Sequence, residues 1–133
     1  MRFQQFLPLG VSAVVAMSIA APARAADVPH ISHAELTKAI QSKRVVLLDV
    51  NGTDSYKSGH IPRALNFEAV QANLKKVLPA NKKTLIVAYC GNEMCGAYKA
   101  GAEAAKKLGY TNVKHYSPGI SGWKKSGARV EKG

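Results

Sequence analysis

Cysteine and long apolar runs are scarce in this chain, and each shortage excludes a class of protein. Two cysteines among 133 residues are too few for a small domain that depends on a disulfide scaffold. The four histidines show no zinc-ligand spacing with the cysteines, so we expect no metal site. The one long apolar run, residues 6–21, is interrupted by Pro8 and Gly10 and is short for a transmembrane helix. We therefore expect no stable insertion of the mature protein into a membrane.

Acidic residues are also few, since 8 of them stand against 19 lysines and arginines and give a formal net charge of +11. We expect no nucleic-acid partner, because the lysines occur as scattered pairs without interleaved aromatic residues. A solvated basic surface attracts small anions instead. The charge therefore favours a small anionic ligand.

The first 25 residues have the pattern of a secretory signal peptide. Met1 and Arg2 form a short positive start, and an apolar stretch follows. Ala23-Arg24-Ala25 then supplies the small-x-small pattern at which such a peptide is cleaved. We expect cleavage near Ala25, one domain over residues 26–133, and export, to the periplasm if the source is a Gram-negative bacterium.

Short apolar runs alternate with helical patterns along residues 26–133. Strands are expected at 45–50, 64–66, 84–89 and 113–116, and helices at 32–42, 67–78, 97–108 and 120–125. The nearly continuous apolar runs at 45–50 and 84–89 are typical of strands that are covered on both faces. The sequence therefore predicts an α/β domain in which helices cover both faces of a mostly parallel central sheet. In such sheets, ligands bind beyond the carboxyl ends of the strands.

Cys90 stands at such a strand end, at the start of a short loop that leads into a helix. Backbone N–H groups and the helix dipole stabilise negative charge there, which lowers the pKa of a thiol and holds an anionic substrate. Cys90 is therefore the candidate nucleophile, and a buried inert cysteine is the alternative. Lys99, in the first turn of the expected helix, adds positive charge. The predicted anion cradle consists of Gly91, Asn92, Glu93, Met94, Cys95 and Gly96.

Four segments, in order and at proper intervals, together resemble the rhodanese-like sulfurtransferase family. The first two are LLDV at 47–50 and GHIPRALN at 59–66, with Tyr56 ahead of the latter. The third is LIVAYC at 85–90, and the last is LGYTNV at 108–113 followed by GISGW at 119–123. The resemblance covers nearly all of residues 26–133. It implies a single rhodanese-like domain with three layers.

The resemblance also implies the transfer of a sulfane sulfur. The Cys90 thiolate would take sulfur from a donor such as thiosulfate and become a persulfide, and cyanide or a thiol would then accept the sulfur. No metal or organic cofactor is expected, because the cysteine is itself the carrier. The expected partners are thus a small anionic sulfur donor and a thiol or cyanide acceptor.

The loop departs from the usual family pattern in three ways. It looks enlarged, it has no arginine between Cys90 and Gly109, and it carries a negative charge at Glu93. Cys95 stands where an arginine or another polar residue is common. Phosphate or arsenate chemistry is not expected, because relatives with that activity close the loop with an arginine. The same departures keep a second function open, that of a sulfur carrier or binding protein without efficient turnover.

Cys95 has two interpretations that the sequence leaves open. It could be a resolving thiol that forms a disulfide with Cys90, which would make the chain a thiol–disulfide protein. It could equally be a small residue packed beneath the loop.

Other conspicuous residues are expected to be structural. Asp49 is expected to hold loop amides at a strand end, His60 to fix a turn, and Trp123 to anchor the last helix in the core. His115 and Tyr116 are expected to line the mouth of the site.

Overall fold

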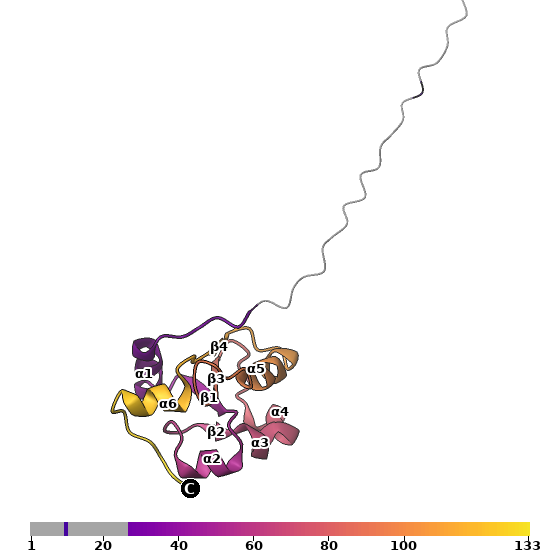
Figure 1. Ribbon diagram of the computed structural model, residues 1–133. Helices are drawn as coiled ribbons and strands as arrows, with labels where there is room; N and C mark the ends of the chain where they lie inside the picture. Colours follow the sequence, from indigo (N-terminus) through magenta and orange to yellow (C-terminus); the bar gives the residue numbers. More distant parts are fainter. Residues whose placement is uncertain (1–9, 11–26) are drawn as a thin grey trace, which may run out of the picture.

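The computed structural model describes Gly10 and residues 27–133. Apart from Gly10, the predicted signal peptide, residues 1–25, lies outside the described residues. The described chain forms a four-stranded, wholly parallel sheet in the order β2-β1-β3-β4 (Figure 1). The strands are β1 (Val45–Asp49), β2 (Leu65–Asn66), β3 (Leu85–Tyr89) and β4 (Val113–His115). The predicted α/β class and parallel sheet are therefore confirmed.

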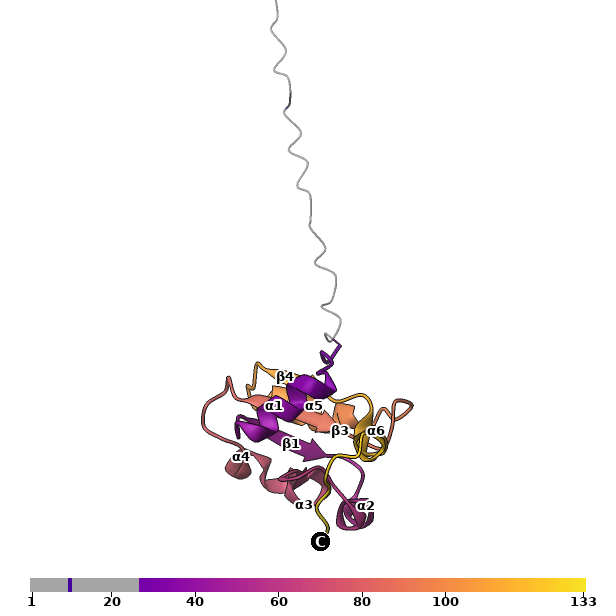
Figure 2. The same cartoon turned by 90° about the vertical axis from the view of Figure 1, so that its left-hand side faces the viewer.

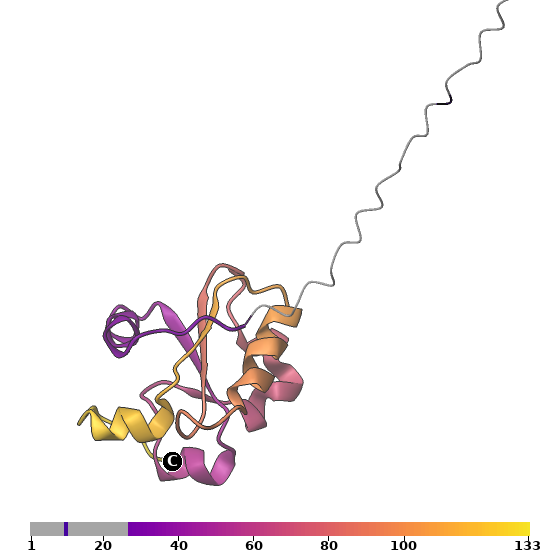
Figure 3. The same ribbon diagram turned by 45° about the horizontal axis from the view of Figure 1, so that its top comes forward.

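Helices cover both faces of the sheet, which makes three layers (Figure 3). The helical segments are α1 (His33–Gln41), α2 (Thr53–Ser58), α3 (Phe67–Val70), the short 3₁₀ helix η1 (Gln71–Asn73), α4 (Leu74–Val77), α5 (Tyr98–Lys107) and α6 (Gly119–Lys125). Helices α1 and α6 lie on one side of the sheet, and α3, α4 and α5 lie on the other (Figures 2 and 3).

Alternation along the central strands produces the two cores. Leu47, Val87 and Tyr89 face Leu36 of α1 and Trp123 of α6. The alternate positions, Leu48, Ile86 and Ala88, face α3, α4 and α5. Because successive side chains of a strand point to opposite faces, a sheet buried on both sides needs a continuous apolar run. The runs at 45–50 and 84–89 meet that need.

Helix α1 begins as the sequence predicts. The Ser32 hydroxyl accepts a hydrogen bond from the Glu35 amide at 3.1 Å, and the Glu35 carboxylate accepts one from the Ser32 amide at 3.2 Å. These two bonds form a capping box, which satisfies amides at the start of the helix that would otherwise lack partners.

Two regions differ from the predicted elements. The expected helix 67–78 is divided into α3, η1 and α4, and Asn73, with φ −120° and ψ 19°, leaves helical geometry between the last two. Of the apolar positions that predict this helix, Leu74 and Val70 pack in the core on this side of the sheet, whereas Val77 is 41% exposed. Helix α2 was not predicted, because residues 53–58 are polar and lack helical periodicity.

Candidate active site

Cys90 directly follows the last residue of β3 and begins the loop that leads to α5. The residue is almost fully buried, with 3% of its surface exposed, whereas Cys95 at the far side of the loop is partly exposed. The loop lies at the carboxyl end of the parallel sheet, where the sequence placed the site. Strand β3, which ends directly before Cys90, therefore places this residue at the carboxyl end of the sheet.

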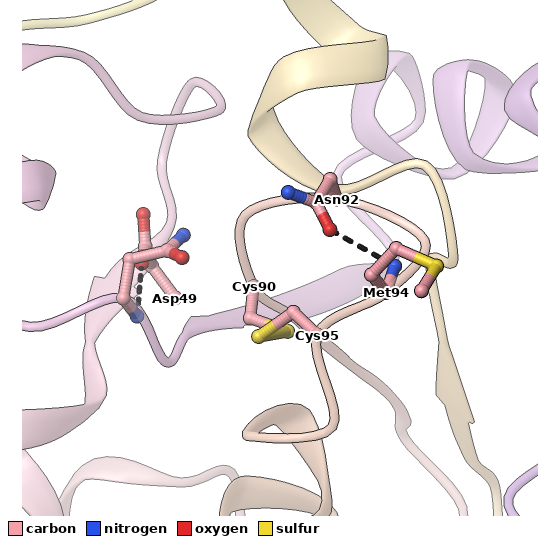
Figure 4. The surroundings of a disulfide bond; sticks show 6 residues. Asp49, Cys90, Asn92, Met94 and Cys95 are labelled. Carbon is pink, nitrogen blue, oxygen red and sulfur yellow. Dashed lines mark hydrogen bonds between the residues drawn. A yellow bond between two sulfur atoms is a disulfide. The ribbon is translucent and has the colours of Figure 1, made fainter.

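Cys90 and Cys95 form a disulfide, with their Cα atoms 6.3 Å apart (Figure 4). Both cysteines are therefore oxidised in this structure. Of the two interpretations of Cys95, the structure shows the disulfide, and Cys95 is not merely a small residue packed beneath the loop. As a consequence, Cys90 has no free thiol until this bond is reduced.

Asn92 forms the turn that brings Cys95 back to Cys90. Its side-chain oxygen accepts a hydrogen bond from the Met94 amide at 2.9 Å, and its carbonyl accepts one from the Cys95 amide at 3.1 Å (Figure 4). The amides of Met94 and Cys95 are thus engaged inside the loop in the oxidised form. Their predicted role in an anion cradle, together with that of Gly91, Glu93 and Gly96, stays a prediction for the reduced form.

The first residues of α6 hold the loop in place through backbone hydrogen bonds. The amides of Ile120 and Ser121 donate hydrogen bonds of 2.9 Å to the carbonyls of Cys90 and Gly91. Gly119 permits this approach because it has φ +62° and no side chain. A Cβ there would lie 2.7 Å from the Gly91 carbonyl carbon, closer than real contacts allow. Sequence reasoning missed this anchoring role, although Gly119 belongs to the closing motif.

Asp49 holds a loop amide at the end of β1, as predicted. Its fully buried carboxylate accepts hydrogen bonds from the Tyr89 hydroxyl at 2.8 Å and from the Asn51 amide at 2.9 Å. The Tyr89 oxygen in turn accepts one from the Ile61 amide at 3.1 Å. Burial, followed by the negative charge of Asp49, raises the pKa of Tyr89 far above its ordinary value, so this hydroxyl stays protonated. The chain of bonds ties the ends of β1 and β3 to the 59–66 segment.

The predictions for His60 and Trp123 are confirmed. His60 is buried, its ring stacks on Tyr56 at 3.7 Å between centroids, and its Nδ1 lies 2.7 Å from the Tyr56 carbonyl oxygen. Trp123 is buried in the core and donates its indole N–H to the Arg129 carbonyl at 2.8 Å.

The expectation that Tyr116 lines the mouth of the site is wrong. Tyr116 is buried, with 2% of its surface exposed, and packs beside Trp123 and His33. His115 stacks on Tyr98, the first residue of α5, with ring centroids 4.3 Å apart, and its Nδ1 lies 2.8 Å from the Val28 carbonyl oxygen. Partial burial lowers the pKa of this imidazole. His115 therefore packs against the helix behind the loop.

A shallow groove of about 330 Å³ adjoins the loop on its outer side. Met94 is 93% exposed at its edge and points away from the disulfide (Figure 4). Two other hollows, of about 140 and 500 Å³, share the lining residues Lys43 and Val45 near the amino ends of the strands, and neither includes a residue of the loop. The groove lining comes from the loop and the region around α6: Asn92, Glu93, Met94, Pro118, Ser121, Gly122 and Lys125.

Two kinds of feature are absent from the described part of the chain. No helix there is both long and apolar enough to cross a bilayer. Nor do three His, Cys, Asp or Glu side chains gather in a way that could hold a metal ion within residues 27–133. The expectation that the reaction needs no cofactor stays a prediction.

Comparison with known proteins identifies the family. The model of the rhodanese-like domain matches residues 32–126. A helix-turn-helix-type transcriptional regulator of Mycobacterium tuberculosis is 31% identical over 104 residues, which are 77% of this chain. Those residues cover only 45% of the regulator, so the chain spans less than half of that relative.

Solved structures show the same fold. A protein of Bacillus halodurans is 25% identical, with a TM-score of 0.62 over 78% of this chain and 77% of its own. The 3-mercaptopyruvate sulfotransferase SseA of Escherichia coli is 18% identical, with a TM-score of 0.66 over 80% of this chain and 52% of its own. The match over residues 32–126, with Cys90 at the end of its central strand, places this chain in the family of rhodanese-like domains.

Proposed function

We propose that the reduced protein is a sulfurtransferase that carries a sulfane sulfur on Cys90. The observation that supports this most is the position of Cys90, which opens the loop at the carboxyl end of β3 in a rhodanese-like chain. In parallel sheets, ligands bind beyond the carboxyl ends of the strands, and Cys90 lies at that end of β3.

The proposed reaction has two steps and needs only the cysteine as carrier. The Cys90 thiolate attacks the sulfane sulfur of thiosulfate, the sulfur–sulfur bond of the donor breaks, and sulfite leaves with the electron pair. Cyanide or a thiolate then attacks the outer sulfur of the Cys90 persulfide, and Cys90 leaves as a thiolate.

Charge supports a small anionic donor. The net charge of +11 attracts anions to the protein as a whole. Near the loop, Lys99 is exposed in the first turn of α5, and Lys125 lines the groove. The positive end of the α5 dipole, at the amino end of that helix, also attracts anions. Glu93, on the same groove, opposes this attraction.

The disulfide sets a condition on this activity. Cys90 is bonded to Cys95, so it attacks a donor only after a reductant has opened the bond. The same bond favours a second candidate function, that of a thiol–disulfide protein in which the two cysteines cycle without handling sulfane sulfur.

Steady-state production of thiocyanate from thiosulfate and cyanide tests the proposal. The protein is reduced, freed of reductant and assayed without oxygen, beside the Cys90→Ser and Cys95→Ser variants. We expect repeated turnover by Cys95→Ser, which cannot form the disulfide of the loop, and none by Cys90→Ser. Formation of no more than one thiocyanate per molecule of Cys95→Ser would favour a carrier, and its absence in both Cys90-containing proteins would favour the thiol–disulfide protein.

We further propose that residues 1–25 direct export to the periplasm. A disulfide persists in an oxidising compartment, which supports this location. Expression of the full chain in a Gram-negative host tests it. The mature protein should be released with the periplasmic fraction and begin near Ala26, and an uncleaved protein in the cytoplasm would contradict the proposal.

A further inference from the structure

We propose that Cys95 discharges the Cys90 persulfide as hydrosulfide, which makes this domain a dithiol-dependent reductase of sulfane sulfur. The inference rests on the proposed function for the persulfide itself. It adds the fate of the sulfur, the role of the second cysteine and the class of the electron donor.

The disulfide shows which sulfur Cys95 reaches. Its Sγ is bonded to the Sγ of Cys90, and in a persulfide that atom is the inner sulfur. Attack on the inner sulfur expels the outer one, whereas attack on the outer sulfur would only move the persulfide to Cys95. The geometry of the loop therefore favours release of the outer sulfur over its transfer to Cys95.

The loop is built to hold this geometry. Asn92 accepts hydrogen bonds from the amides of Met94 and Cys95, which closes the turn between the two cysteines. The amides of Ile120 and Ser121 fix the carbonyls of Cys90 and Gly91 on the other side. A nucleophile held beside its target reacts with a high effective molarity, so Cys95 competes well against dissolved acceptors.

The step balances in atoms and electrons. The Cys95 sulfur attacks Cys90 Sγ and forms the disulfide, while the bond between Cys90 Sγ and the outer sulfur breaks. The electron pair of that bond leaves with the outer sulfur, which takes the proton of the Cys95 thiol and departs as hydrosulfide. The two cysteine sulfurs are oxidised together by two electrons, and the sulfane sulfur is reduced by two.

A dithiol then restores the protein, and the exposure of the two cysteine residues sets the point of attack. Cys90 is buried to 3% exposure and Cys95 is partly exposed, so the incoming thiolate meets Cys95 Sγ. This attack forms a mixed disulfide on Cys95 and releases Cys90 as the thiolate that the next donor needs. The second thiol of the donor then attacks the mixed disulfide, frees Cys95 and leaves the dithiol oxidised by two electrons.

A single turnover without any reductant in solution tests the inference. Wild type, Cys95→Ser and Cys90→Ser proteins are reduced, desalted under anaerobic conditions and mixed with excess thiosulfate. Sulfite, sulfide, sulfur that cyanide can remove, and free thiols are then measured per protein molecule. Cys95→Ser is the matched control, because serine preserves the size of the side chain and removes only the attacking sulfur.

We expect wild type to release one sulfite and one sulfide, to retain no removable sulfur and to lose both thiols. Cys95→Ser should release one sulfite, retain one removable sulfur and form no sulfide, and Cys90→Ser should release neither product. Wild type that keeps its removable sulfur, or Cys95→Ser that forms sulfide as fast as wild type, would overturn the inference and leave the proposed function intact. Absence of sulfite from both Cys90-containing proteins would instead overturn the proposed function and this inference with it.

Discussion

Gly119 lies directly against the Cys90 carbonyl oxygen and the peptide that joins Gly91 to Asn92. A Cβ at this position would lie 2.7 Å from the Gly91 carbonyl carbon and 2.9 Å from the Asn92 nitrogen. The closeness allows the first amides of α6 to bond the loop. The fold of the last helix thus controls the conformation of the loop that carries the disulfide.

Gly119→Ala should therefore be more destabilising than left-handed strain alone accounts for. The strain costs about 1–2 kcal/mol for a residue with a side chain, and the contact with the loop adds to it. Gly127→Ala is the matched control, because Gly127 has φ +79° but open space where a Cβ would lie. Urea unfolding measures both variants, and an equal loss of stability would contradict a close contact at Gly119.

Tyr89→Phe should lower the free energy of unfolding by about 1.5–3 kcal/mol, the usual range for a hydrogen bond to a charged group. The substitution removes the hydroxyl that donates to the buried Asp49 carboxylate and accepts from the Ile61 amide. Tyr110→Phe provides the comparison, since the Tyr110 hydroxyl donates to the neutral Pro79 carbonyl. Chemical denaturation should show a clearly smaller loss for Tyr110→Phe, and the reverse order would refute the role given to Asp49.

Acid should weaken the fold partly through His115. Burial lowers the pKa of this imidazole in the folded protein, so below about pH 6.5 the unfolded chain binds the proton more readily. The stability that depends on the neutral ring is present above that pH and is lost as the pH falls towards the folded pKa. The free energy of unfolding of His115→Gln should change less than that of wild type between pH 7.5 and 5.5. Parallel curves for the two proteins would show that His115 does not contribute.

Reduction of the disulfide should begin at Cys95. Brief treatment of the oxidised protein with glutathione, followed by acid quenching and alkylation, traps the first mixed disulfide for tandem mass spectrometry. Because Cys90 is 3% exposed and Cys95 is more open, the adduct should be on Cys95 and the alkyl group on Cys90. An adduct mainly on Cys90 would contradict this order of attack.

The layers and the nucleophile could be predicted from the sequence because they depend on local patterns. The apolar runs at 45–50 and 84–89 are long enough to indicate buried parallel strands, and Cys90 follows the second of them. Helix α2 was not predicted because its start depends on a contact with a residue far away in the sequence. The Thr53 amide donates to the Glu68 carboxylate at 2.6 Å, across 15 positions of the chain.

The state of Cys95 could not be predicted for a related reason. The path of the loop depends on the Asn92 turn and on contact with α6, which begins 29 positions after Cys90. The closing motif contained Gly119, but its effect on the loop follows only from the packing of α6 against Cys90 and Gly91. Sequence patterns report such tertiary contacts poorly.

The mass of the intact Cys95→Ser protein after exposure to thiosulfate tests the central claim most directly. This variant cannot form the disulfide of the loop, so a persulfide on Cys90 has no internal route of discharge. The account predicts a species heavier by one sulfur atom that disappears with cyanide and does not form when Cys90 is also replaced by serine. An unchanged mass after thiosulfate would contradict the account, and the domain would then share the fold of its family without the proposed chemistry.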